Sequence, residues 1–501
     1  MANVQSRTQS KGKSKSKSKG TSAPRSSAAR TADARKRSLP RGNDMTERQA
    51  ASAGVAPSQS RALVKAASGL RVRMYRVGFG DFFLLSVPTK AGVGHILIDC
   101  GVHAQDLGSM RDAVTQMAKD CGNHLSLVIM THRHADHISG FGTCSDVFAQ
   151  IAVDRVWMPC FENPSDKKAA AFQASLAAMA GHLSQQFRAR LAAQPDDATE
   201  QMLAMAENVT GGLSVEGLGA AGISRNQKAL QVLHGGFKTP AAHDYYKAGG
   251  VAKLPPDLEA AGLTAQILGP PIDDALIVQM TNKNQQYLAG ATEDQDFGDP
   301  VKPFPDAFRA TDEAHSSRAF ELYGPDQIIR MIQGAQPDAL AAQAVAADKT
   351  LNNQSLVILF SYGGKNLLFA GDAQWGNWEY FLYGGAYGTP GHTKLTQKAE
   401  EILSKIDFYK VGHHGSANAT PRDAVMAMRA GCVGMCSTQE HAYNEVPRAP
   451  LLDALRKRMN DQLARSDQVA INDEEDANPD AGKLPSAFTA PTHRLFIDYN
   501  F

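Results

Sequence analysis

The residues of this chain with the clearest chemical potential are His132, His134, Asp136 and His137, which form a His-x-His-x-Asp-His pattern. Neutral imidazole and carboxylate are ligands that zinc and similar divalent ions accept. The pattern directly follows the apolar run 125–130, which predicts a buried strand. A solvated histidine-rich loop is the alternative, but four ligand-type side chains at this spacing favour a metal site.

The spacing divides these residues into two pairs. His132 and His134 lie two positions apart, so in an extended loop both side chains point to one side and can share an ion. Asp136 and His137 can reach a second ion beside it. Two cations about 3.5–4 Å apart clamp the attacking and leaving oxygens of a phosphoryl displacement, and they lower the pKa of a bridging water. The pattern therefore predicts a hydrolytic centre that uses a metal-bridged hydroxide.

Three further apolar stretches end in residues of the same chemical types. These stretches are 94–101, 366–372 and 407–416, and they carry Asp99, Asp372 and the tandem His413-His414. Each reads as a strand followed by a short loop. Four ordered motifs, each at the end of an apolar strand, are far more specific than any one of them.

In this order the motifs resemble those of the metallo-β-lactamase fold superfamily. The resemblance implies that Asp99 braces the metal loop and that Asp372 bridges the two ions. Either His413 or His414 would complete the second site, and the His-Gly-Ser ending favours His414. The resemblance also implies the fold class: α/β, a metallo-β-lactamase-like αββα sandwich of two mixed sheets flanked by helices.

A narrower resemblance is to the hydrolase domain of the bacterial competence DNA-uptake protein (ComEC-like). It rests on Gly-Phe-Gly-Asp at 78–81, Asn-Gln-Ser at 353–355 and the KxxHHGS form at 410–416, and it covers about residues 70–160 and 260–450 in pieces. It implies that Asp81 supports the site from a tight turn; an inert, solvated acid is the alternative.

One departure from the superfamily concerns a third histidine for the first metal. The chain between the second motif and the bridging acid offers His182, His234, His243 and His315, none in the expected local context, with His234 the best of them. The first site is therefore expected to be weaker and exchangeable. We expect two divalent ions, Zn²⁺ first, with Mn²⁺ also plausible.

We expect Asp136, Lys410 and His413 to take part in catalysis. His413, if it is not the ligand, would contact phosphate or protonate the leaving oxygen. Lys410 would contact an anionic substrate; a lysine with a buried stem and an exposed head is an equally good interpretation. The leading hypothesis is a metal-dependent phosphodiesterase or nuclease. The alternatives are hydrolysis of a small ester, lactone or thioester on the same fold, and a metal-binding module without catalysis.

The charge distribution is asymmetric although the net charge is only +1. Residues 1–45 hold twelve Lys or Arg against two acids, a net charge of +10, which leaves −9 on the remainder. Few apolar residues interrupt this basic segment, so we expect a disordered tail over 1–68. It either tethers the protein to nucleic acid or another anionic surface, or solubilises it; an organelle transit peptide is a third option.

The sequence also limits where in the cell we expect the protein to be. No stretch reaches the roughly 18 consecutive apolar residues that a membrane span requires, and the N-terminus lacks the apolar core of a secretory signal. The six cysteines are scattered and do not suggest a disulfide framework. We therefore expect a cytoplasmic protein without a membrane span.

The remaining chain, 69–501, is expected to form one hydrolase domain. A helical insertion is expected at about 160–260 and a loop-and-helix insertion at about 272–350. Period and composition predict strands at 71–77, 82–87, 95–99, 125–130, 151–158, 264–268, 355–361, 366–370 and 493–499, and helices at 112–119, 167–193, 197–208, 339–347, 396–406 and 450–465.

Overall fold

The computed structural model describes residues 69–103, 107–193, 195–210, 225–287, 350–440, 446–468, 483–491 and 495–501. The predicted disordered tail at 1–68 and the predicted helix at 339–347 lie outside the described residues. The same holds for His315 and for most of the insertion predicted at 272–350.

The first sheet joins the N-terminal strands to the C-terminus. Its order is β13 (Phe488–Thr489), β14 (Phe496–Asn500), β1 (Arg71–Tyr75), β2 (Phe82–Thr89), β3 (Gly92–Cys100), β4 (His124–Ile129), β5 (Ala152–Pro159) and β6 (Ala242–Tyr246). Pairing is antiparallel from β13 to β3 and parallel from β3 to β6, so the sheet is mixed.

The second sheet is built from the second half of the chain. Its order is β12 (Leu463–Arg465), β11 (Val433–Cys436), β10 (Phe408–Lys410), β9 (Lys365–Phe369), β8 (Val357–Tyr362) and β7 (Thr264–Gly269). The pairs β7–β8 and β8–β9 are antiparallel, whereas β9 to β12 run parallel.

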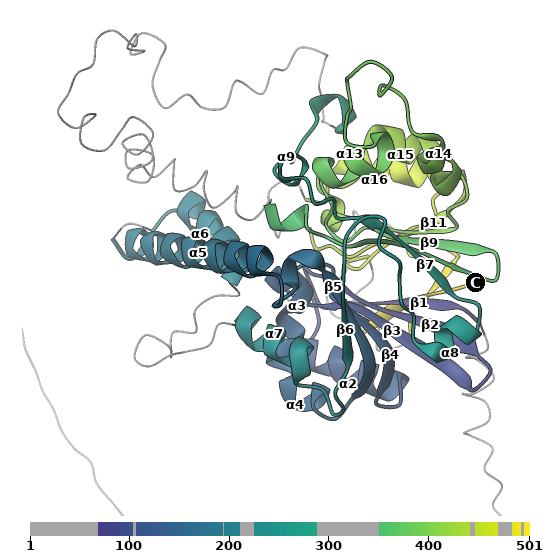
Figure 1. The fold of residues 1–501 in the computed structure, drawn as a ribbon, viewed down its shortest axis with the longest axis horizontal. Coiled ribbons are helices and arrows are strands. Elements are labelled where there is room, and N and C mark those ends of the chain that lie inside the picture. The colour runs from purple at the N-terminus through teal and green to yellow at the C-terminus, as the bar shows by residue number, and fades with distance from the viewer. Residues whose placement is uncertain are drawn as a thin grey trace, which may run out of the picture. The chain divides into compact units, whose positions relative to one another are not determined.

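The described residues form helices that flank the two sheets. They are α2 (Met110–Asp120), α3 (Ala135–Thr143), α4 (Ser145–Phe148), α5 (Lys167–Ala193), α6 (Asp197–Thr210), α7 (Arg225–Gly235), α8 (Pro256–Ala260), α9 (Asp274–Ile277), α13 (Trp375–Tyr383), α14 (Gln397–Leu403), α15 (Arg422–Ala427) and α16 (Ala449–Arg458), with 3-10 turns η1 (Cys160–Glu162), η3 (Lys283–Gln285) and η5 (His413–Gly415). Helices α2, α3, α4 and α7 pack on the first sheet, and α13 to α16 pack on the second (Figure 1). The predicted αββα sandwich of two mixed sheets is confirmed.

The central strands are apolar on both faces because each face packs against a different layer. In β3, Ile96 and Ile98 join the cluster between the two sheets, whereas Leu97 between them packs under the helices. In β9, Phe369 faces the first sheet, where its ring centroid lies 6.3 Å from that of Phe83. Strands buried on both faces lose the polar alternation of a half-exposed strand, which explains the near-continuous apolar runs in the sequence.

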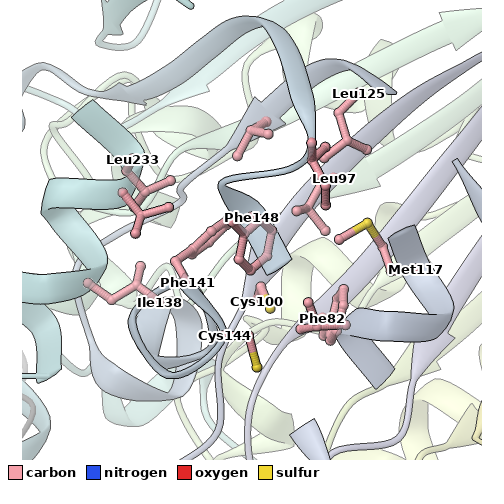
Figure 2. Packing of buried hydrophobic residues seen from close by; sticks show 14 of the residues in the cluster. Phe82, Leu97, Cys100, Met117, Leu125, Ile138, Phe141, Cys144, Phe148 and Leu233 are labelled. Atoms are coloured by element: carbon pink, nitrogen blue, oxygen red, sulfur yellow. The ribbon is translucent and has the colours of Figure 1, made fainter. Parts of the chain in front are cut away.

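The core below the first sheet holds α3, whose first turn carries the last two residues of the metal-ligand pattern, Asp136 and His137. Figure 2 shows Phe141 of α3 against Phe148 of α4, with their ring centroids 4.7 Å apart, and Leu233 of α7 beside them. Phe82 and Leu97 close this cluster from the sheet. The packing fixes α3 on the sheet and thereby fixes the loop that precedes it.

Two predictions about secondary structure are partly wrong. The helix predicted at 450–465 ends at Arg458, because Asn460 and Asp461 adopt positive φ and the chain turns into β12. The segment 160–260 is not purely a helical insertion, since its last part returns to the first sheet as β6.

Within the described ranges, no helix combines the length and the apolar character that crossing a membrane requires.

Candidate metal centre

The four predicted motifs meet at the carboxyl ends of parallel strands. Strands β3 and β4 run parallel in the first sheet, as do β9 and β10 in the second. The carboxyl ends of parallel strands lie at one edge of a sheet, the usual place for a site in α/β proteins. The loops after these four strands carry the ligand-type residues.

Four donors from these loops form one buried cluster: Asp136, His137, Asp372 and His414, whose donor atoms all lie within 4.8 Å of one another. His414 Nε2 lies 3.0 Å from Asp136 Oδ2 and 3.4 Å from Asp372 Oδ2. His137 Nε2 lies 3.1 Å from Asp372 Oδ2. The structure thus brings together four predicted ligands from both halves of the sandwich, and it places His414 rather than His413 among them.

Hydrogen bonds on the far side of each ring aim both imidazoles at the cluster. His137 Nδ1 donates to Asp99 Oδ2 at 2.8 Å, and His414 Nδ1 donates to the Ser437 carbonyl at 2.8 Å. Asp99 in turn accepts from the Thr131 backbone N–H at 2.7 Å and from its hydroxyl at 2.6 Å. Such partners fix the tautomer and orientation of metal-binding histidines. Ser437 was not predicted, although it follows the next parallel strand, β11.

The donor set fits a divalent cation. Asp136 Oδ1 is buried and accepts no hydrogen bond from any described residue. An unsatisfied buried carboxylate oxygen is costly, and a cation beside it would remove that cost. Two carboxylates and two imidazoles suit Zn²⁺ and also Mn²⁺. The cluster is therefore compatible with a metal-dependent hydrolase.

Charges within the cluster compensate one another. Burial lowers the pKa of His137, but Asp372, Asp99 and Asp136 outweigh it and raise the pKa well above its ordinary value. In the same way burial opposes, and Asp372 and Asp136 produce, a rise in the pKa of His414 to about 10. Burial raises the pKa of Asp136, yet His137 and His414 hold it well below the usual value. A bound cation would take over the charge that protons on the two rings otherwise supply.

The second predicted pair, His132 and His134, lies next to this cluster. His132 Nε2 and His134 Nδ1 are 3.0 Å apart, and the centroid of the His132 ring is 4.1 Å from that of His137. Burial is the main cause that lowers the pKa of His132 well below its usual value and that of His134 to about 4. Both rings are thus held neutral, which is the form that binds metal.

Among the described histidines, none supplies a third ligand to this pair. His234, the best candidate in the sequence, stacks on His243 with ring centroids 5.6 Å apart. His243 Nε2 is bound to the Leu233 carbonyl at 2.9 Å, and His182 lies on α5. None of these three belongs to a buried ligand cluster of the described chain.

Lys410 is fully buried at its charged end, so the interpretation with an exposed head is wrong. Its side chain is 2% exposed, its ammonium forms an ion pair with Asp81, and Nζ lies 3.5 Å from Asp372 Oδ1. The Gly371 carbonyl accepts from Nζ at 3.1 Å. Asp81 is therefore buried and paired, not the inert solvated acid that was the alternative, and it lies 3.7 Å from the rings of both His137 and His414.

His413 lies at the rim and outside the four-donor cluster. Its Nδ1 lies 2.6 Å from Ser416 Oγ and 3.1 Å from Asn418 Oδ1, and its Nε2 lies 3.3 Å from Asn352 Nδ2. Its backbone N–H donates to Asp372 Oδ1 at 3.0 Å. Asn352 and Asn418 were not predicted. The ring is positioned by polar groups of its own loop and by Asn352.

Three residues of this site have a strained backbone. Asp99, His413 and His414 have φ values of 55°, 44° and 51°, in the left-handed region that residues with a Cβ rarely adopt. Each such residue costs on the order of 1–3 kcal/mol and persists only where the surroundings enforce it. Here the enforcing contacts are the hydrogen bonds that aim His137 and His414.

Gly101 lets the strand end of β3 touch the ligand loop. A Cβ at this position would lie 2.4 Å from the backbone nitrogen of His137 and 2.4 Å from the carbonyl carbon of Asp136. We expect Gly101→Ala to displace the ligand loop, to lower the free energy of unfolding by about 1–3 kcal/mol and to weaken metal binding. Gly181, on α5 with nothing within 4 Å of its Cβ position, is the matched control: Gly181→Ala should leave both quantities unchanged or add stability. Chemical denaturation and metal titration of both variants measure this.

Comparisons with known proteins add little to this geometry. No protein-family model matches the chain, and no curated protein matches it. Among solved structures, it is similar to a beta-lactamase domain protein from Burkholderia ambifaria, with 17% identity and a TM-score of 0.20. The match covers 40% of this chain and 45% of that structure, less than half of its length. We therefore base the fold class on strand order and layers.

Proposed function

We propose that this protein is a metal-dependent phosphodiesterase, with nucleic acid as its substrate class, and that it is related to the ComEC-like hydrolase domains of the metallo-β-lactamase superfamily. The observation that carries the proposal is the cluster of Asp136, His137, Asp372 and His414, in which four donors from three loops lie within 4.8 Å of one another. The motifs in their order along the chain support the relationship.

The position of each residue in the site determines the role that we assign to it. Asp136, His137, Asp372 and His414 would hold one cation, and His132 with His134 would hold a weaker second one. Bound divalent ions would supply Lewis acidity and make hydroxide available near neutral pH. Asp99 and the Ser437 carbonyl keep the two rings aimed inward.

Phosphodiesters are favoured over small esters by two observations. Two adjacent donor sets suit a substrate whose attacking and leaving oxygens both need charge stabilisation. The net charge of +10 on residues 1–45 would strengthen contact with a polyanion. His413, whose ring lies against Ser416 and Asn418, would contact the substrate.

The full chain should be stripped with chelator, reloaded with Zn²⁺ or Mn²⁺, analysed for metal content and offered a substrate panel. We expect metal-dependent hydrolysis of bis-p-nitrophenyl phosphate and of single-stranded DNA. Turnover of lactones or thioesters but of no phosphodiester would replace the proposal with a small-ester hydrolase. Stoichiometric metal with no turnover of any substrate would leave a metal-binding module.

A further inference from the structure

The ligand loop has two faces with different partners. His134 is extended, with φ −62° and ψ 150°, and α3 begins at the next residue. The side chains of His132, His134 and Asp136 are buried on the metal side. The backbone of the intervening Arg133 and Ala135 faces the helices of the segment 160–260. A shift of the Arg133 or Ala135 backbone by these helices would therefore move His134, which lies between them.

Two buried asparagines from that segment hold the loop backbone. Asn226 of α7 donates through Nδ2 to the Arg133 carbonyl at 2.8 Å. Asn208 of α6 accepts through Oδ1 from the Ala135 backbone N–H at 2.9 Å, which is one of the unpaired donors at the start of α3. Asn226 Nδ2 also lies 3.1 Å from the Asn208 carbonyl, so the two helices are tied to each other at this point.

The Arg133 side chain extends the same support to the other half of the protein. It forms a two-pronged contact with Glu162 of η1, with N–O distances of 2.9 and 2.6 Å. Gln173 of α5 donates to Glu162 at 3.0 Å and to Gln354 Oε1 at 3.1 Å. Gln354 precedes Ser355, whose hydroxyl accepts from the Asp372 backbone N–H at 3.0 Å. A polar network thus runs behind the ligand loop from the helices to the loop of Asp372.

We propose that α6 and α7 form a brace that sets the metal affinity of the centre, with Asn208 and Asn226 as its positioning residues. The inference rests on the proposed function in so far as the cluster binds a cation. Each asparagine satisfies a buried backbone group that flanks His134, and an unsatisfied group there would favour a displaced loop. Loss of an outer partner of a metal site typically costs about tenfold to a hundredfold in affinity.

The two asparagines allow a matched test, because the same change has opposite consequences at the two sites. Asn208 acts as an acceptor, so Asn208→Asp keeps its hydrogen bond and places a negative charge at the start of α3, where it is favourable. Asn226 acts as a donor, so Asn226→Asp removes the bond and sets a carboxylate oxygen against the Arg133 carbonyl. Both variants have the same size and net charge. Asn208→Leu removes the acceptor and serves as a further variant if Asn226→Asp does not fold.

Two measurements distinguish a failure of the brace from a failure of the proposed function. Co²⁺ titration of the full chain, followed by visible absorption, should show affinity about tenfold to a hundredfold weaker for Asn226→Asp and Asn208→Leu and close to the original for Asn208→Asp. Hydrogen exchange of the metal-free protein should show faster exchange at residues 133–138 in the two weakened variants only. Equal behaviour of the two Asp variants in both readouts would overturn the brace. Absence of Co²⁺ binding by the unsubstituted chain, with exchange changed as expected, would instead overturn the proposed function.

Discussion

Replacing Asp136 and His137 together by alanine is expected to abolish metal-stimulated phosphodiester hydrolysis. The pair supplies half of the four-donor cluster, and its loss leaves only Asp372 and His414 from that set. Metal ions contribute several kcal/mol to stabilisation of the transition state, so kcat/KM should fall by about 10³-fold or more. Metal content after dialysis should fall in parallel. The measurement is hydrolysis of bis-p-nitrophenyl phosphate with Zn²⁺ or Mn²⁺ in excess.

The chain offers an exposed control with the same residue types. His124 and Asp154 form an exposed pair across β4 and β5, with 3.0 Å between His124 Nε2 and Asp154 Oδ1. Exposed pairs of this kind contribute little, so alanine at both positions should leave hydrolysis and metal content unchanged. If the Asp136 and His137 double variant kept the activity of this control, the metal assignment would be wrong.

The sequence was most informative where chemistry and strand pattern coincide. His137 and Asp372 follow apolar strands in the order of the superfamily motifs, and the resemblance predicted that their segments meet, although β4 and β9 belong to different sheets. The same held for the tandem His413-His414, where the pattern also favoured the residue that joins the cluster. These predictions needed the local patterns, the order of the motifs and the family resemblance that the order supports.

Residues that act through distant partners could not be predicted in this way. Asn208 and Asn226 lie on helices whose sequences carry no ligand motif, and their roles arise only when α6 and α7 pack behind residues 133–135. The burial of the Lys410 head was missed for a related reason. A lysine at the end of a strand is usually solvated, and its partner Asp81 is remote in sequence and arrives from the other sheet.

The short elements show a further limit of pattern analysis. β6 pairs parallel with β5 after some eighty intervening residues, so nothing local distinguishes it within a mainly helical segment. The end of α16 was missed because Leu463 to Arg465 continue its apolar spacing, although they pair with β11. In both cases tertiary pairing overrides a local preference.

Lys410→Met should be the most destabilising single change in the centre. Methionine matches the length of the stem but removes the ammonium that lies against both Asp81 and Asp372. Breaking a buried ion pair by removing one partner costs about 3–5 kcal/mol, because the remaining charge stays buried and uncompensated. We expect a loss of this size in the free energy of unfolding of the metal-free protein, measured by urea denaturation.

The same experiment separates a structural role of Lys410 from contact with substrate. Lys405→Met is the control, because Lys405 pairs with Glu401 on the surface at 2.7 Å and should change stability by less than about 1 kcal/mol. Zn²⁺ should restore part of the stability of Lys410→Met, since an ion beside Asp372 binds only the folded state. An unchanged free energy of unfolding with a raised KM would show that the ammonium reaches substrate instead. The Lys410 side chain is 2% exposed and contacts two carboxylates. We therefore expect its charge to stabilise the buried Asp81 and Asp372 and not to bind substrate.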